Sequence, residues 1–148
     1  MTKLNSMKMY IPARGKNESF ARNVIAGFAV DCSPTVGEIG DIKTAVSEAV
    51  TNAVVHAYDS EDERNLIEIA ADIDEDSVLT VSVRDFGRGI EDVELARQPF
   101  FTTKPGEERS GMGFTMIETF MDEMDVVSEP GKGTTVTMKK RIGGDAER

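Results

Sequence analysis

Hydrophobic residues recur at helical spacing in one stretch before the middle of the chain. Between residues 41 and 56, apolar side chains stand three and four positions apart, as one buried helix face requires. They are Ile42, Val46, Ala49, Val50 and Ala53. Beside them Glu48, Asn52 and His56 stand four apart, which on a helix brings neighbouring side chains within about 5 to 6 Å. The pattern predicts a helix over residues 38–57 whose polar row is either part of a functional site or a partly solvated edge.

Elsewhere the hydrophobic pattern alternates with a period of two, which predicts strands. Residues 7–11 alternate before Pro12, which cannot donate to a ladder, so the first strand is expected at a sheet edge. Two β-rich runs flank the acidic turn 74–76, an arrangement typical of an antiparallel hairpin. The strands are predicted over residues 66–71 and 78–85 of that hairpin and near residues 125–128 and 134–140 of a second one.

Two further helices are predicted, one before and one after the first hairpin. The earlier helix follows the polar turn 15–19, and Arg22 is expected to face outward from it. Its expected buried stripe consists of Phe20, Val24, Ile25 and Phe28. The later helix is marked by Met116, Ile117, Phe120, Met121 and Met124. Between the first hairpin and the later helix, residues 86–109 form a turn-rich segment with one short helix near 92–96, and loops of this length are usually functional.

The order of these elements predicts an α/β fold. We expect a two-layer sandwich with helices on one face of a mixed, mostly antiparallel sheet. The 148 residues fit a single domain over residues 1–142, followed by a tail, 143–148, that we expect to be disordered.

Composition and charge narrow the functional classes. A formal net charge of −10 argues against nucleic acid as a partner, because nonspecific affinity for it comes from accumulated Lys and Arg. The chain has no apolar run of about 18 residues and no evident secretory signal, so we expect no membrane association and a cytoplasmic location. The single Cys32 cannot form an internal disulfide, which agrees with a reducing compartment, and we interpret it as a small buried hydrophobe.

Three short motifs carry residues suited to binding a ligand. Residues 85–89, Asp-Phe-Gly-Arg-Gly, join an acid that can accept a hydrogen bond from an amine to glycines that permit close backbone approach. Residues 110–114 place glycines at a helix start, where free N–H groups attract anions. Residues 100–104 add hydroxyls and Lys104, and Arg109 adds a second positive charge. Each motif alone also fits an ordinary turn or a solvated loop; together they indicate a polyphosphate site.

The order of the motifs resembles the GHKL superfamily of ATPases and kinases over residues 38–136. A helical Glu-x3-Asn-x3-His is followed by Asp-x-Gly-x-Gly, Phe-Thr-Thr-Lys, Gly-Met-Gly-Phe and Gly-x-Gly-Thr-x-Val. Within that superfamily, nearly the whole chain is similar to the bacterial anti-sigma serine protein kinases, and particularly to the sporulation anti-sigma F factors. The segments that carry this closer match are residues 17–22, 47–53, 96–99, 101–105 and 108–114. The chain departs from the pattern in having Ala57 where a Gly is common and a single Gly-x-Gly pair in the lid.

The resemblance implies ATP and Mg²⁺ as cofactors, with ADP as the product. It assigns Asp85 to the adenine amino group and Gly87 and Gly89 to close approach of the base. Thr134 would support the same pocket through Asp85 or a water molecule.

The resemblance also assigns the metal, the catalytic acid–base group and a lid. Asn52 would offer an amide oxygen to Mg²⁺, a hard cation that prefers oxygen ligands and keeps several waters. Glu48, one turn earlier, would accept or orient the proton of an incoming serine hydroxyl, whereas His56 is interpreted as structural. A lid over the phosphates would consist of Lys104, Arg109 and the backbone of Ser110, Gly111, Met112, Gly113 and Phe114, and Thr103 is also expected to bind the nucleotide.

Protein partners follow from the same resemblance. It implies an anti-sigma factor that binds and inhibits a sporulation sigma factor, sigma F, when loaded with ATP. It also implies phosphorylation of a serine on an anti-anti-sigma protein that otherwise displaces the sigma factor, with ADP favouring the complex with the unphosphorylated antagonist. Glu18 and Arg22 are expected at the docking surface, although Arg22 also fits an ordinary surface arginine. A homodimer is expected, through the N-terminal edge strand.

Other functions remain open at this stage. The chain fits a general-stress anti-sigma kinase of the same family, or a binding module that holds ATP as a structural ligand and transfers nothing. Glu48 distinguishes a kinase from the binding module, because a protein that only binds ATP needs no acid at this position. A catalytic fragment of a sensor histidine kinase fits less well, because the only histidine, His56, lies in the predicted ATP helix.

Overall fold

A five-stranded antiparallel sheet is the backbone of the fold. The computed structural model describes residues 3–97 and 113–143, and the predicted tail beyond Gly143 lies outside this range. The strands run in the order β1-β2-β3-β5-β4, and all four pairings are antiparallel, so the expected mixed character is absent from the described strands. Their bounds are Lys3–Pro12 (β1), Leu66–Asp74 (β2), Val78–Asp85 (β3), Glu123–Glu129 (β4) and Gly133–Arg141 (β5). Both predicted hairpins and the edge position of β1 are confirmed.

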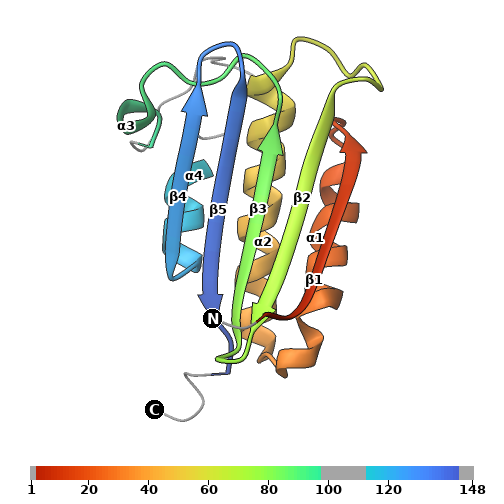
Figure 1. Ribbon diagram of the computed structural model, residues 1–148, viewed down its shortest axis with the longest axis vertical. Helices are drawn as coiled ribbons and strands as arrows, with labels where there is room; N and C mark the ends of the chain where they lie inside the picture. The colour runs from red at the N-terminus through yellow and green to blue at the C-terminus, as the bar shows by residue number, and fades with distance from the viewer. Residues whose placement is uncertain (1–2, 98–112, 144–148) are drawn as a thin grey trace.

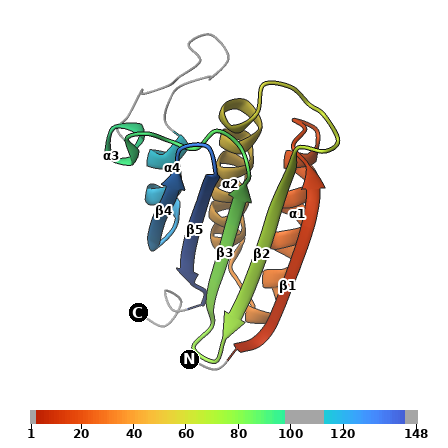
Figure 2. The ribbon, with the colours of Figure 1, turned by 45° about the horizontal axis from the view of Figure 1, so that its top comes forward.

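Helices α1, α2 and α4 cover one face of the sheet, which confirms the predicted two-layer sandwich (Figure 1, Figure 2). Their bounds are Asn17–Ala29 (α1), Val36–Asn52 (α2) and Gly113–Phe120 (α4); the short α3, Val93–Ala96, lies at one end of the sheet, beside β4. Within residues 3–97 and 113–143, the helices are all too short or too polar to cross a bilayer.

Helix α2 lies at the centre of the helical layer, between α1 and α4 (Figure 1). Its start is fixed by a capping box, in which Glu38 N–H donates to Thr35 Oγ1 over 3.0 Å and Thr35 N–H donates to the Glu38 carboxylate over 2.9 Å. The predicted apolar stripe is confirmed in full: Ile42, Val46, Ala49, Val50 and Ala53 are all buried. The alternating positions of β2, β3 and β5 complete the core beneath it.

The end of α2 differs from the sequence-based prediction. Regular α-helix stops at Asn52, and residues Ala53–Ala57 form a single wider π-turn instead of a last α-turn. Two consecutive β-branched residues, Val54 and Val55, lie in this turn, and their restricted χ1 makes them poor α-helix formers. His56 is therefore not placed by the simple four-residue spacing of the polar row.

Two apolar assignments in the other helices are corrected. The stripe of α1 that faces the core is Ala21, Ile25 and Ala29, whereas Phe20 is 53% exposed. Small alanine side chains let α1 approach its neighbours closely. The sequence-based prediction selected large apolar residues and therefore missed the two buried alanines. Met124 lies in β4 and not in α4, which ends at Phe120.

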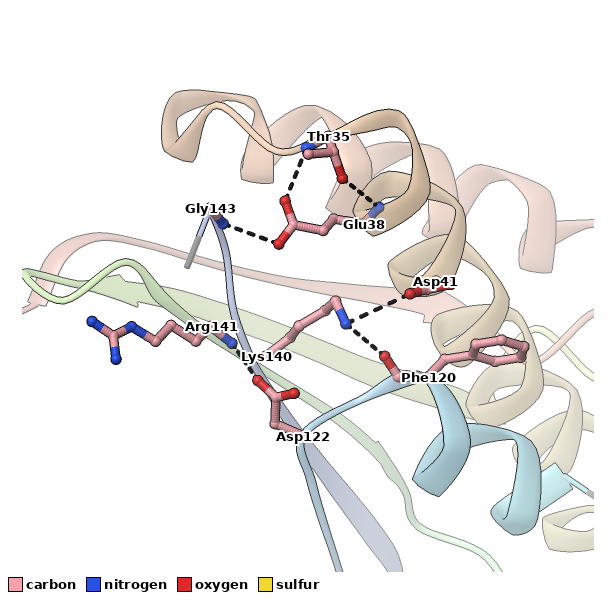
Figure 3. A network of polar contacts seen from close by, with 8 residues as sticks. All are labelled: Thr35, Glu38, Asp41, Phe120, Asp122, Lys140, Arg141 and Gly143. Carbon is pink, nitrogen blue, oxygen red and sulfur yellow. Dashed lines mark hydrogen bonds and ion pairs between the residues drawn. The ribbon is translucent and has the colours of Figure 1, made fainter. Parts of the chain in front are cut away.

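A buried lysine joins three elements near the end of β5 (Figure 3). Lys140, on the core face of β5, donates from Nζ to the Phe120 carbonyl oxygen at the end of α4 over 2.9 Å. Its ammonium group also lies 3.6 Å from an Asp41 carboxylate oxygen on α2. Beside it, the Glu38 carboxylate accepts a hydrogen bond from Gly143 N–H over 3.0 Å. These contacts fix the end of β5 and the end of α4 to the start of α2.

Candidate functional site

A cavity of about 430 Å³ opens where four secondary-structure elements meet at their ends. Its walls include Asn52 at the end of α2, Asp85 at the end of β3, Gly113 at the start of α4 and Thr134 near the start of β5. All four belong to the motifs that the sequence singled out. In Figure 1 these ends lie at the top of the sheet, opposite the start of β1 and the end of β5.

Asp85 is a buried acid with one oxygen committed to the protein. Its Oδ1 accepts hydrogen bonds from Gly87 N–H over 3.0 Å and from Thr134 N–H over 3.2 Å. Its Oδ2 has no hydrogen-bond partner among the described residues. Every fully buried side-chain oxygen of those residues does have a partner, so Oδ2 is not fully buried. It is accessible from the cavity that Asp85 lines. Burial raises the pKa of the carboxyl group, against the opposing effect of the two N–H donors. The site therefore presents a single acceptor oxygen at the end of a fixed strand.

The two glycines that follow Asp85 permit close packing of backbone against backbone. A β-carbon at Gly87 would lie 2.2 Å from the Ala57 carbonyl oxygen, and one at Gly89 would lie 2.2 Å from the Glu129 carbonyl oxygen. Gly89 also has a φ of +76°, which favours glycine. Gly89 lines the cavity and Gly87 does not. Both positions hold the loop after β3 tightly between the π-turn and the β4–β5 turn.

Further hydrogen bonds that sequence reasoning missed hold this loop in place. Ser128 Oγ accepts from Ile90 N–H over 2.7 Å and lies 2.7 Å from Thr134 Oγ1. Tyr58 Oη accepts from Phe86 N–H over 2.8 Å and donates to a β2 carbonyl oxygen. Neither residue belongs to a recognisable motif. Tyr58 reaches the loop after β3 because it directly follows the π-turn, and Ser128 reaches it from β4. The Asp85 carboxylate is thus presented by a braced loop.

Among residues 3–97 and 113–143, Asn52 carries the one amide side chain on the cavity wall. Its side-chain oxygen and nitrogen make no hydrogen bond within the described part of the chain, and neither is fully buried. A β-carbon at Gly113 would lie 2.6 Å from Asn52 Nδ2, so the start of α4 lies directly against this amide. The amide oxygen of Asn52 is therefore available to a ligand beside the N-terminus of α4.

The other two members of the polar row occupy different places. His56 lines the cavity from within the π-turn. Glu48 is half-buried one helical turn before Asn52 and is not part of the cavity wall. Glu48 thus lies next to the Asn52 end of the cavity, at the distance of one helical turn.

The remaining wall of the cavity is largely apolar. It suits a flat, uncharged ring, because burying such a ring against apolar side chains is favourable without polar compensation. These side chains are Ile90, Leu95, Ala96, Phe114 and Pro130. Charged residues also line the cavity: Arg88, whose guanidinium pairs with Asp59, and the acids Glu91 and Asp92.

Several sequence-predicted site residues lie outside the described residues. They belong to the segment 98–112 and are Thr103, Lys104, Arg109, Ser110, Gly111 and Met112. Of the predicted lid, Gly113 and Phe114 are described, and both line the cavity.

The predicted partner residues form a hydrogen-bonded cluster at the boundary between α1 and α2. Arg22 donates to the Glu18 carboxylate over 2.7 Å and to Ser47 Oγ over 3.3 Å, and Ser47 Oγ also donates to Glu18. Arg22 was expected to face outward, but its side chain is 36% exposed and lies across the α1–α2 boundary, because Ser47 offers it a second partner. Glu18 and Arg22 are therefore held in position by hydrogen bonds to each other and to Ser47.

The chain matches a family model described as the histidine kinase-like ATPase domain over residues 11–140. It is 56% identical over 139 residues to the anti-sigma F factor of Caldanaerobacter subterraneus subsp. tengcongensis, an alignment that covers 94% of this chain and 95% of that protein. It is 54% identical to the anti-sigma F factor of Geobacillus kaustophilus, with 93% of each chain covered.

Among solved structures, the fold is similar to the crystal structure of the RsbU and RsbW domains of Rv1364c from Mycobacterium tuberculosis. The TM-score is 0.69 at 22% sequence identity, and the match covers 93% of this chain and 32% of that one. At this level of identity the similarity concerns the fold alone.

Proposed function

The chain belongs to the anti-sigma F factors, a family built on the histidine kinase-like ATPase domain, and we propose that it is an ATP-dependent anti-sigma factor and serine protein kinase. One observation carries the proposal: a single cavity is lined by a buried acid, an available amide and the start of a helix, brought together from three separate elements. Each of these groups suits a different part of Mg²⁺-bound ATP.

Adenine would lie against the apolar wall with its amino group directed at Asp85. The accessible Oδ2 can accept one N–H of that group, while Oδ1 stays bonded to Gly87 and Thr134. Guanine has an oxygen in place of the amine, and an acceptor facing an acceptor is unfavourable. The proposal therefore includes preference for ATP over GTP.

The phosphates would lie toward the start of α4, whose free N–H groups and dipole favour negative charge. Asn52 would supply one amide oxygen to Mg²⁺. No group of three or more His, Cys, Asp or Glu residues within 3–97 and 113–143 could hold a metal on its own, so the phosphates and water would supply the other ligands. The residues present fit Mg²⁺ as a partner of the nucleotide. The metal would neutralise charge on the transferring phosphoryl group.

Glu48 would act on the incoming serine. Its position one turn from Asn52, beside the cavity and not in its wall, suits a group that contacts the protein substrate at the phosphate end of the nucleotide. The serine oxygen forms a bond to the γ-phosphorus as the bond to the leaving oxygen of ADP breaks. Glu48 accepts the hydroxyl proton, which contributes typically about 10² to 10⁴ in rate.

The partners we propose are the sporulation sigma factor, sigma F, and an anti-anti-sigma protein that is the phosphorylation substrate. Both would dock at the Glu18/Arg22 cluster, which lies on α1 next to the end of α2. We further propose a cytoplasmic homodimer that pairs through the exposed edge of β1.

Phosphotransfer tests the proposal directly. The protein would be incubated with Mg–ATP and the anti-anti-sigma protein, and the substrate would be examined by intact-mass spectrometry. A gain of one phosphate, lost about 10²-fold or more in rate with Glu48→Gln while ATP affinity stays within about threefold, supports the kinase. If the wild-type protein binds ATP but transfers no phosphate to the substrate, the chain is a nucleotide-dependent binding module and not a kinase. If Glu48→Gln lowers ATP affinity and phosphotransfer equally, Glu48 serves in ATP binding and not in catalysis.

A further inference from the structure

Two hydroxyl groups face each other across strands β4 and β5 at the end of the sheet that carries the cavity. Ser128 and Thr134 are direct cross-strand partners, and their hydroxyl oxygens lie 2.7 Å apart. Both belong to the core face of their strands, on which Val126 and Val136 form the next pair. Thr134 is buried and lines the cavity, whereas Ser128 does not line it. Ser128 therefore reaches the cavity only through Thr134.

Ser128 Oγ has three polar neighbours but a single proton to donate. It accepts from Ile90 N–H over 2.7 Å, and a backbone N–H can only donate. The Gly133 carbonyl oxygen lies 3.2 Å away and can only accept. The third neighbour, Thr134 Oγ1, can do either. The proton of Ser128 therefore goes either to Gly133 or to Thr134.

The direction of the Ser128 proton decides what Thr134 offers to the cavity. If Ser128 donates to Gly133, the Thr134 hydroxyl donates to Ser128 Oγ and presents only lone pairs to a ligand. If Ser128 donates to Thr134, the Thr134 proton is left for the cavity. The contact with Gly133 is longer than the contact between the two hydroxyls, so it is the weaker of the two. A ligand that offers an acceptor to Thr134 therefore selects the second arrangement at little cost.

Thr134 lies beside the acid that is proposed to accept the adenine amine. Its N–H donates to Asp85 Oδ1 over 3.2 Å, and both residues line the cavity. In adenine the amine is flanked by two ring nitrogens, N1 and N7, each with a free lone pair. An amine directed at Asp85 therefore brings one of these nitrogens toward the Thr134 hydroxyl.

We propose that Ser128 is a positioning residue for base recognition: it directs the Thr134 hydroxyl proton into the cavity, where that proton is donated to the ring nitrogen beside the adenine amine. The inference rests on the proposed nucleotide site and adds a second hydrogen bond to the one at Asp85. An acceptor at Asp85 and a donor at Thr134 match the donor and the acceptor that adenine presents side by side. Ser128 itself does not contact the base.

Calorimetric titration of the full chain with Mg–ATP and with its 1-deaza and 7-deaza analogues tests the inference. Each analogue replaces one ring nitrogen by a C–H group, so the pair distinguishes N1 from N7. In the wild-type protein, one of the two analogues should bind about 3- to 10-fold more weakly than ATP, the usual effect of one lost hydrogen bond. In Ser128→Ala, ATP should weaken by the same factor, while the affinity of that analogue stays within about twofold, because it has no lone pair for Thr134.

Two further variants separate positioning from bracing of the loop after β3. Tyr58→Phe removes a hydroxyl that holds the same loop at Phe86, so it should weaken ATP and both analogues by one common factor. Ser128→Thr keeps a hydroxyl at position 128 and should keep the preference for ATP over the analogue. If Ser128→Ala does not fold, Ser128→Cys has a similar volume and only a weak donor, and it should lose most of the same preference.

Each remaining outcome contradicts the inference or the function on which it rests. Unchanged ATP affinity in Ser128→Ala, or an equal loss for ATP and both analogues, would make Ser128 at most a brace of the loop and leave the nucleotide site standing. Equal affinity of the wild-type protein for ATP and both analogues would remove the hydrogen bond from Thr134 to the ring. Absence of ATP binding in the wild-type protein would overturn the proposed function and the inference with it.

Discussion

Gly113 lies so close to Asn52 that a β-carbon at position 113 would be 2.6 Å from Asn52 Nδ2 and 2.8 Å from its Oδ1. The start of α4 and the end of α2 therefore meet at a point where no larger residue fits without displacing the amide. Since Asn52 is the proposed magnesium ligand, this contact sets the position of the metal relative to the helix start that would hold the phosphates.

Gly113→Ala is expected to weaken Mg–ATP binding by about tenfold or more without unfolding the protein. The obstructing atoms are the end of a flexible side chain, so Asn52 can turn away at little cost to stability, and alanine is a better helix former than glycine. Calorimetric titration and thermal unfolding measure the two effects. Gly40→Ala is the matched control, because nothing lies within 4 Å of the added methyl group in α2, and it should change neither nucleotide affinity nor the fold. If Gly113→Ala binds Mg–ATP with unchanged affinity, Asn52 is not a ligand of the metal.

Asp85→Asn is expected to lower ATP affinity by about 10- to 100-fold, because a charged acceptor of the adenine amine is lost. The same variant should be at least as stable as the wild-type protein at pH 7. Burial raises the pKa of Asp85, so the ionised carboxylate opposes folding, and its unfavourable effect appears as the pH rises through the folded-state pKa. The difference in the free energy of unfolding should shrink below about pH 4, where both states are protonated. A variant that binds ATP normally would remove Asp85 from the base site.

Glu38→Gln is expected to destabilise the fold by about 0.5–1.5 kcal/mol at pH 7. Burial alone would raise the pKa of Glu38, but hydrogen bonds from Thr35 and Gly143 and the nearby Lys140 outweigh it and lower the pKa. An acid whose pKa is lowered by folding contributes stability above its unfolded pKa and loses it as the pH falls through the folded value. Urea unfolding at pH 7 and at pH 3 should show the effect disappearing in acid. Glu75→Gln, in the exposed β2–β3 turn, should be neutral, and a pH-independent loss in Glu38→Gln would contradict the assignment.

Lys140→Met is expected to lower the free energy of unfolding by about 1–3 kcal/mol. Methionine fills a similar volume but leaves the Phe120 carbonyl oxygen and the Asp41 carboxylate without their cation. Lys139→Met, on the exposed face of the same strand, should change stability by no more than about 0.5 kcal/mol. Chemical denaturation of the pair measures the difference. Equal effects at the two positions would mean that the two Lys140 contacts drawn in Figure 3, with Phe120 and Asp41, contribute nothing.

Long periodic patterns made most of the fold predictable. The stripe of α2, from Ile42 to Ala53, repeats often enough to determine both the helix and its buried face, and the alternation in β2 and β3 does the same for the hairpin. Asp85, Asn52 and Thr134 were predicted to meet because the order of their motifs resembled a known superfamily, and the cavity brings them together.

The rest depends on contacts that a one-dimensional pattern does not carry. The π-turn changes the helical period within five residues, too short a stretch for periodicity to detect. The buried stripe of α1 consists partly of alanines, and Lys140 is a charged residue at a core position, so hydrophobicity alone misplaces both. Ser128 and Tyr58 reach the site only because distant segments fold against the loop after β3.

The central claim is that one cavity binds Mg–ATP through Asp85 and Asn52, and isothermal titration of the purified protein with ATP and GTP tests it most directly. The account predicts one ATP per chain, affinity at least about tenfold weaker for GTP, and weaker ATP binding when Mg²⁺ is removed by a chelator. Equal affinity for the two nucleotides, or no saturable binding of ATP, would contradict it.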